Sequence, residues 1–132
     1  MTIGRRMTNQ RGVASVEFVL ILPILLFVLF IGVELSRAWM TLNLLTSAAR
    51  EAVRAGVVAA PTAVTSAGNT RLNQILGAGN WFGAGVGCSQ NPCAPNDLVT
   101  AQVSMNFITV LPNIWILPQP LVLQQTASMR YE

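Results

Sequence analysis

The sequence has 132 residues and predicts one small domain rather than two. Hydrophobic residues make up 52% of the chain and charged residues only 10%. This composition excludes a disordered chain, and it is more apolar than that of an ordinary soluble domain of this size. The excess apolar surface must therefore lie in a membrane or against partner proteins.

The residue inventory argues against catalysis. The chain has no His and only two Cys, so it lacks the usual general base and cannot complete a four-ligand zinc site alone. Ser and Thr occur without a base to activate them, and the sequence contains no phosphate-binding loop. We therefore expect no enzyme activity, no catalytic residue, no metal, no cofactor and no nucleotide.

The net charge of +3 comes from the start of the chain. Arg5, Arg6 and Arg11 lie in a twelve-residue leader without acidic residues, whereas five Arg and five acidic residues cancel from Val13 onward. Nucleic-acid binding requires a basic face on the folded part of a protein. We therefore do not expect a nucleic-acid partner.

An apolar segment follows the leader and predicts a transmembrane helix. No residue from Phe18 to Val33 is charged, and the span from Val13 to Val33 contains 21 residues, within the roughly 17–25 that a spanning helix needs. The leader Arg residues, set against Arg37 alone beyond the far end, predict an N-terminus in the cytoplasm. Pro23 removes one backbone hydrogen bond and should kink the helix.

Glu17 stands at the threshold of this apolar segment, where a carboxylate is costly unless it has water or a function. It marks the head-group boundary, or it has a role in assembly. Gly12 comes before Val13, and Glu17 and Phe18 follow at the start of the apolar run. This arrangement resembles the type IV prepilin processing site, in which cleavage falls after the Gly, here between Gly12 and Val13.

A longer stretch is similar to the TadE-like pseudopilins of the tight-adherence (Tad) system. The resemblance rests on Glu17-Phe18, on Pro23, on Glu34 at the end of the apolar run and on the segment Ala48–Arg54. The closing segment Thr126–Glu132 also resembles the last strand of that family. The similarity covers residues 9–56 and 99–132, and residues 61–97 carry no family signature.

The resemblance implies a minor pilin that is processed by a prepilin peptidase and acts in assembly of Tad (Flp-type) pili, for surface adherence and biofilm. It implies residence in the bacterial inner membrane in a single pass, with a periplasmic C-terminal domain. The implied partners are a second, TadF-like pseudopilin, the inner-membrane platform and the major pilin, with energy from a separate ATPase. Whether the chain enters the pilus, initiates it or stays in the membrane is left open.

Two other interpretations fit the same apolar segment. The first is an uncleaved single-pass membrane anchor that carries a small extracytoplasmic binding domain. The second is a secreted module released by cleavage after Ala38, which the segment Ser36–Ala38 loosely suggests. Gly12 together with Glu17 discriminates between the pseudopilin and the plain anchor.

Cleavage after Gly12 would remove the leader and create an amine on Val13, about one helical turn from Glu17. In a stack of such helices, Glu17 of one subunit can meet this amine on a neighbour. Two unit charges about 4 Å apart attract by roughly 4 kcal/mol at an effective dielectric of 20, before desolvation. We expect this pair to fix the register between subunits.

The helical pattern continues from residue 34 to about Ala60 as a stalk, and Pro61 should end it. Small residues recur every four positions, and they can contact either the chain's own outer domain or another subunit: Ala48, Ala52 and Gly56. Arg50 and Arg54 share one face, which is either solvated or a docking surface for partners.

Residues 61–97 predict a linker, a short helix and a cysteine loop. We expect a linker over residues 61–70, a short helix capped by Asn69 or Thr70, and a loop over the glycine-rich residues 77–87. Cys88 and Cys93 fit a small disulfide loop in an oxidising compartment better than a metal or redox site.

Residues 98–132 predict an antiparallel β region. Apolar and polar residues alternate from Val99 to Phe107 and again from Leu121 to Tyr131. The apolar, proline-broken segment 110–120 between them can pack on the sheet or stalk, touch lipid or bind a partner, and we expect packing. The fold class is α+β, with a long N-terminal transmembrane and stalk helix, a short helix and a small periplasmic antiparallel sheet.

Overall fold

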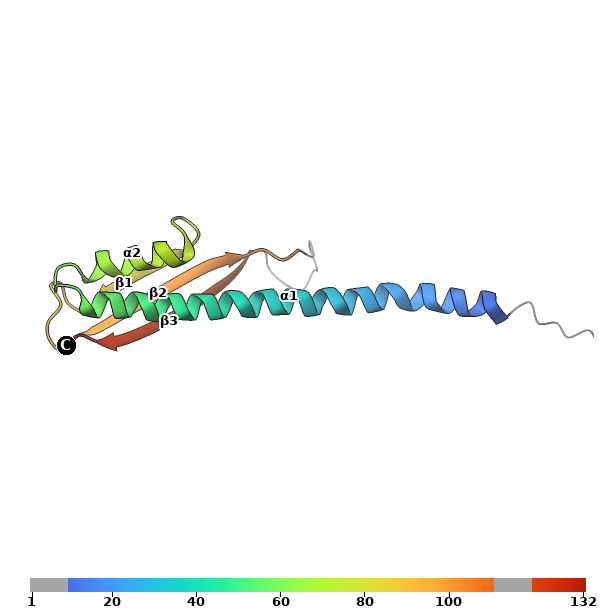
Figure 1. Cartoon of the computed structure of the whole chain (residues 1–132), viewed down its shortest axis with the longest axis horizontal. Coiled ribbons are helices and arrows are strands. Elements are labelled where there is room, and N and C mark those ends of the chain that lie inside the picture. Colours follow the sequence, from blue (N-terminus) through green and yellow to red (C-terminus); the bar gives the residue numbers. More distant parts are fainter. Residues whose placement is uncertain (1–9, 111–119) are drawn as a thin grey trace, which may run out of the picture. The chain divides into compact units, whose positions relative to one another are not determined.

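The computed structural model describes residues 10–110 and 120–132, and the side chains from residue 12 onward. The chain divides into two compact units, Met1–Ser36 and Arg37–Glu132, which we call the N-terminal unit and the head. The described part contains two helices and three strands: α1 (Gln10–Val58), α2 (Val64–Leu76), β1 (Phe82–Cys88), β2 (Leu98–Phe107) and β3 (Leu121–Arg130) (Figure 1). These elements confirm the predicted α+β class.

Helix α1 begins before the apolar segment and continues into the head. Pro23 lies inside it, and the helix continues on both sides of this residue. The helix ends at Val58, two residues before the predicted end, and the amide of Ala59 donates to the carbonyl of Gly56 over 3.1 Å. Such a bond closes the last turn tightly, so that the chain leaves the helix just before Pro61.

Helix α2 corrects the prediction of a linker over residues 61–70. It begins at Val64, with Ala63 as its N-cap, so Asn69 and Thr70 lie inside the helix and do not cap it. The buried stripe of α2 has a four-residue spacing: Val64, Gly68, Leu72 and Leu76. Gly68 interrupts the apolar pattern in the sequence although it is buried, and this hid the first half of the helix.

Strand β1 corrects the prediction of a loop over residues 77–87. Glycine occupies three of the seven positions of this strand, and Gly83 and Gly85 have positive φ angles of 129° and 66°, which favour glycine. The ladder between β1 and β2 shifts register between Phe82 and Gly85, as at a β-bulge. Pairing with β2 and packing of α2 therefore make this segment a strand, although its residues have low strand propensity.

The two predicted strands are confirmed as β2 and β3, and they pair antiparallel. Their ladder runs without a shift from Leu98 opposite Arg130 to Phe107 opposite Leu121. The sheet order is β1-β2-β3, so β2 is central. The inward-facing residues of β2 are mostly fully buried, whereas those of β3 are partly exposed, and β3 therefore lies at the margin of the core.

One face of α1 supplies the helical half of the core. Its buried residues are mostly small: Leu45, Ala48, Ala49, Ala52, Val53 and Gly56. From the sequence, these small residues could contact either the chain's own outer domain or another subunit. The structure places them in the core of the head itself. Small side chains let the helix approach the inner face of the sheet closely. Residues 111–119, on which the expectation of packing by segment 110–120 falls, lie outside the described residues.

Candidate functional site

The predicted processing and assembly residues lie near the start of α1. Gly12, Val13, Glu17 and Phe18 are all helical and exposed. A Cβ added at Gly12 would meet no neighbouring atom within 4 Å. The backbone at this position is therefore open to another protein, although a peptidase that needs an extended segment must first unwind the first turns of the helix.

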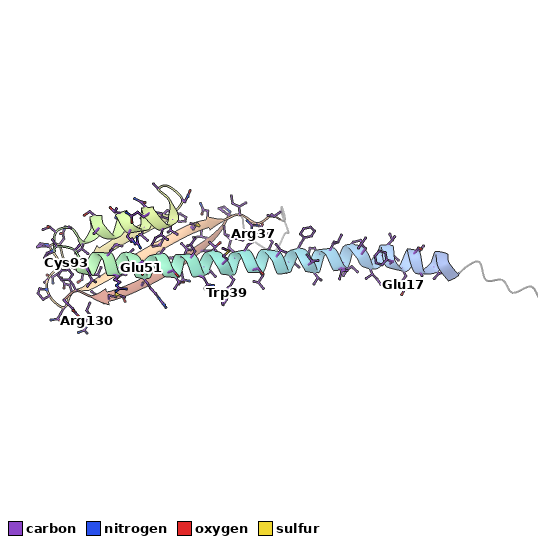
Figure 2. All side chains as sticks on the ribbon, in the orientation of Figure 1. Glu17, Arg37, Trp39, Glu51, Cys93 and Arg130 are labelled. Atoms are coloured by element: carbon purple, nitrogen blue, oxygen red, sulfur yellow. A yellow bond between two sulfur atoms is a disulfide. The ribbon has the colours of Figure 1, made fainter. Side chains whose placement is uncertain are left out.

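Val13 and Glu17 share one face of α1, since they are four residues apart. A shallow groove follows this face and is lined by Gly12, Val13, Val16, Glu17 and Leu20. Helical side chains tilt toward the N-terminus, so the carboxylate of Glu17 leans back toward Val13. Figure 2 shows Glu17 on the N-terminal part of α1. The carboxylate thus lies beside the position where an amine would appear after cleavage.

The surroundings of this motif suit a lipid environment. The part of α1 within Gly12–Val58 includes a stretch long and apolar enough to cross a membrane, and no part of that stretch is buried by the rest of the chain. Large apolar side chains are exposed through the segment, for example Leu20, Leu25 and Phe30. In water such a surface would be unfavourable, whereas in a bilayer it needs no further partner.

The cysteine loop lies at the end of the head where α1 stops. Cys88 and Cys93 are joined by a disulfide, with their Cα atoms 5.8 Å apart. The amide of Cys93 donates to the carbonyl of Pro61 over 3.3 Å. The amide of Ala94 donates to the Asp97 carboxylate over 2.8 Å. The bond from Cys93 ties the loop to the turn between α1 and α2, and the bond from Ala94 closes a local turn just after the loop.

A groove of about 370 Å³ separates this turn from the cysteine loop. Its lining contains hydroxyl and amide groups but no carboxylate and no base: Pro61, Thr62, Val64, Thr65, Gly87, Cys88, Gln90, Asn91 and Cys93. The groove offers hydrogen bonds to a polar surface and no group that could transfer a proton.

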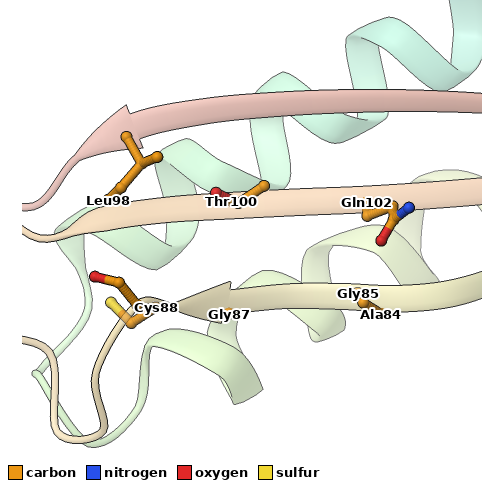
Figure 3. Close-up of a pocket in the computed structure, with 8 residues that line it drawn as sticks. Ala84, Gly85, Gly87, Cys88, Leu98, Thr100 and Gln102 are labelled. Atoms are coloured by element: carbon orange, nitrogen blue, oxygen red, sulfur yellow. The ribbon is translucent and has the colours of Figure 1, made fainter.

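A second groove, of about 290 Å³, lies on the outer face of the sheet over β1 and β2 (Figure 3). Gly85 and Gly87 of β1 line it, and Thr100 and Gln102 of β2 form part of its floor. Its lining again holds no charged side chain. Among the residues that the structure describes, no three metal-binding side chains come together.

Arg50 and Arg54 both lie on the exposed face of α1. Within the described residues neither makes an ion pair, whereas Arg71 on α2 approaches Glu51 to 3.9 Å. Both groups of that pair are about half exposed, so it contributes little to stability. The structure therefore leaves both guanidinium groups of the predicted docking pair accessible, but it brings no partner to them.

Sequence reasoning missed three contacts that hold the head together. Asn69 Oδ1 accepts a hydrogen bond of 2.9 Å from the amide of Val86, which satisfies part of the free edge of β1. The Arg37 guanidinium lies 5.4 Å from the ring centre of Phe107. The Tyr131 hydroxyl bonds to Ala59. Each contact joins residues far apart in the sequence, where periodicity gives no signal.

Comparison with known proteins agrees with the N-terminal motif. Residues 12–54 match the family model described as TadE-like protein. No curated protein and no solved structure matches the chain. The matched segment includes Gly12, Val13, Glu17, Phe18 and Pro23, and also Arg50 and Arg54. From Gly12 to Arg54 the chain is therefore TadE-like in sequence, which confirms the resemblance drawn from its residues over this part of α1.

Proposed function

We propose that this chain is a minor pilin, or pseudopilin, that acts in assembly of Tad (Flp-type) pili and so in surface adherence and biofilm formation. The observation that carries the proposal is the placement of Gly12, Val13 and Glu17 on one face of an apolar helix whose sequence is TadE-like. A plain anchor has no need of an acidic residue at this position.

The proposed maturation step is hydrolysis of the Gly12–Val13 peptide bond by a prepilin peptidase. Water adds across the amide, which leaves a carboxylate on Gly12 and an ammonium group on Val13. The three leader Arg residues depart with the leader. The mature helix then begins at Val13, with a positive charge at its first residue and Glu17 about one turn further on.

Glu17 has a specific part in this proposal. Its side chain lies about one turn from the start of the mature helix and leans back toward the N-terminus, where the helix dipole and the free amides favour a carboxylate. In a stack of subunits, it pairs with the Val13 ammonium group of a neighbour. An unpaired carboxylate in lipid is strongly penalised, so only stacks in the correct register are favourable. The pair therefore selects one arrangement of subunits.

The proposed location follows from the charge of the leader, and the proposed partners follow from the TadE-like resemblance. Three leader Arg residues favour an N-terminus on the cytoplasmic side and a head on the periplasmic side of the bacterial inner membrane. The partners are the prepilin peptidase, a TadF-like pseudopilin, the major pilin and the inner-membrane platform. We propose a non-enzymatic role, with the energy for assembly supplied by a separate ATPase.

The assembly role is tested with Glu17→Gln, which keeps the size of the side chain and removes its charge. Cells that carry this variant should insert the protein into the membrane at normal levels but assemble far fewer pili. Glu34→Gln is the matched control, because it removes an acidic residue at the other end of the apolar run. Normal piliation with Glu17→Gln would contradict the proposed pairing.

An uncleaved single-pass anchor with a small extracytoplasmic binding domain is the alternative. It predicts that pili form normally without this chain, because the anchor takes no part in assembly. Deletion of the chain followed by complementation with the unaltered sequence separates the two functions. Loss of pili on deletion supports the pseudopilin, whereas unchanged piliation supports the plain anchor.

A further inference from the structure

Two contacts fix how the sheet of the head runs relative to α1. Arg37, the first residue of the head, lies over the ring of Phe107 at the end of β2. The Tyr131 hydroxyl, just beyond the end of β3, bonds to the carbonyl of Ala59 just after α1. Strand β2 therefore runs opposite to α1, and its last residues lie at the level of Arg37.

The start of β3 also lies near the level of Arg37 along α1. Val122 is opposite Asn106 in the ladder, one residue from Phe107. A strand advances about 3.3 Å per residue, and a helix about 1.5 Å per residue, so one residue of a strand covers the same distance as about two residues of a helix. Val122 therefore lies near the level of Trp39. We call this part of the head the proximal end and define it by Arg37, Trp39, Met40, Phe107, Ile108 and Val122.

Large apolar side chains are exposed around the proximal end. The exposed fraction is 67% for Trp39, 76% for Met40, 69% for Ile108 and 51% for Val122. Trp39 and Met40 lie on α1, whereas Ile108 and Val122 belong to the β2–β3 hairpin. Exposed apolar groups that gather at one place mark a contact with a protein or a membrane.

The distribution of charged residues also indicates a contact at the proximal end. The chain contains no charged residue from Leu98 to Met129, so the strands of the hairpin carry a charge only at the last residue of β3, Arg130. From Arg37 to Ala49, Arg37 is the one charged residue. The opposite end of the head, by contrast, carries Asp97, Arg130 and Glu132, next to the end of β3. A cation among apolar and aromatic groups suits the phosphate and acyl boundary of a lipid leaflet.

The exposed apolar groups share one position along the length of the head, its proximal end, but they lie on different sides of it. Trp39 and Arg37 are two residues apart on a helix, so they point to different sides of α1, as Figure 2 shows. A protein partner that docks on one side would contact only some of these groups. A bilayer meets all sides of one end at once. The sequence also places Trp39 only six residues after Val33, the last residue of the predicted membrane segment.

We infer that the proximal end of the head is a membrane-surface binding site, in which Ile108 and Val122 enter the head-group region of the leaflet that α1 leaves. The ligand is a phospholipid surface, with Arg37 near the phosphate groups. This contact would hold the head against the membrane before assembly and would have to break when the subunit leaves the bilayer. The inference rests on the membrane span of the proposed function and on no other part of it.

The test uses the full chain in vesicles of phosphatidylethanolamine and phosphatidylglycerol. An environment-sensitive NBD probe is attached to a cysteine at Ile108→Cys, without reductant, so that the Cys88–Cys93 disulfide stays closed. Ser128→Cys is the matched control, because Ser128 is an exposed residue of β3 toward the opposite end of the head. Nitroxide groups on the lipid chains quench a probe that enters the bilayer.

The probe at position 108 should show a blue-shifted emission and a loss of intensity with nitroxide lipids, at every protein-to-lipid ratio. The probe at position 128 should show neither. A probe at 108 that responds only to rising protein density would mean a protein interface and would overturn the inference. Water-like emission at both positions would also overturn it. Vesicle flotation and resistance to alkaline carbonate show separately whether α1 is inserted.

A second pair of variants tests the same contact by adding a charge to β3 while the probe stays at position 108. Val122→Asp places a carboxylate at the proximal end, whereas Thr126→Asp places one on the same face of β3 further from it. With NBD at position 108, Val122→Asp should abolish the quenching by nitroxide lipids and Thr126→Asp should leave it unchanged. Equal quenching in both variants would contradict the inferred site.

Discussion

The phenol hydroxyl of Tyr131 donates a hydrogen bond of 2.9 Å to the main-chain carbonyl of Ala59. This bond joins the end of β3 to the end of α1, across 72 residues of sequence. The backbone of Tyr131 is also fixed, because its amide donates to Asp97 and its carbonyl accepts from Asn96. One residue therefore connects the helix, the hairpin and the cysteine loop.

Tyr131→Phe should lower the free energy of unfolding of the head by about 1 kcal/mol, because it removes one partly buried hydrogen bond. Tyr131→Ala should cost several times as much, since Tyr131 is 92% buried (8% exposed) and its ring would leave a cavity. The measurement is denaturant unfolding of the full chain in detergent micelles, followed by tryptophan fluorescence. Equal stability of Tyr131→Phe and the unaltered chain would show that the bond contributes nothing.

Gly68→Ala should destabilise the head by about 1–3 kcal/mol, since overpacking forces neighbouring atoms apart. A Cβ at this position would lie 2.6 Å from the side chain of Val86. Gly87→Ala is the matched control, because a Cβ there meets nothing within 4 Å. The control should change stability by less than about 0.5 kcal/mol. A result in which both variants are equally stable would refute the close approach of α2 to β1.

The Cys88–Cys93 disulfide should be present in protein recovered from the periplasmic side of membranes. Alkylation of the denatured, unreduced chain should modify neither cysteine, and alkylation after reduction should modify both. Because the closed loop is short, reduction should cost roughly 2 kcal/mol in the chain-entropy model. The Cys88→Ser, Cys93→Ser double variant should show the same loss, and free thiols in the native protein would contradict the pairing.

The sequence predicts some elements of this fold better than others for physical reasons. Apolar and polar residues largely alternate in β2 and β3 because one face of each strand is buried, so a period of two reveals both strands, although Val122 and Gln125 of β3 depart from it. Glycine occupies three of the seven positions of strand β1, and the conformation of this strand is imposed by pairing with β2 more than by its own residues. Gly68 hides the buried stripe of α2, since a helix that needs close contact uses the residue without a side chain.

The sequence likewise predicts some residues of the candidate site, whereas others are apparent only in the structure. Gly12, Glu17 and Phe18 are recognisable from spacing within a few residues, and the TadE-like match includes them. Ala48 and Ala52 show a small-residue line, but only the structure shows that it packs inside the head. Arg37 and Phe107 are 70 positions apart, so their contact, and with it the position of the proximal end, needs three-dimensional information.

Processing after Gly12 is tested by determining the N-terminal residue of the protein recovered from membranes, with and without an active prepilin peptidase. We expect the protein to start at Val13 only where the peptidase is active. Gly12→Val should block this cleavage, and Gly4→Val, the matched change elsewhere in the leader, should not. A start at Met1 or Thr2 in both strains would refute processing by the peptidase and leave a plain membrane anchor, and a start at Trp39 would mean a secreted domain.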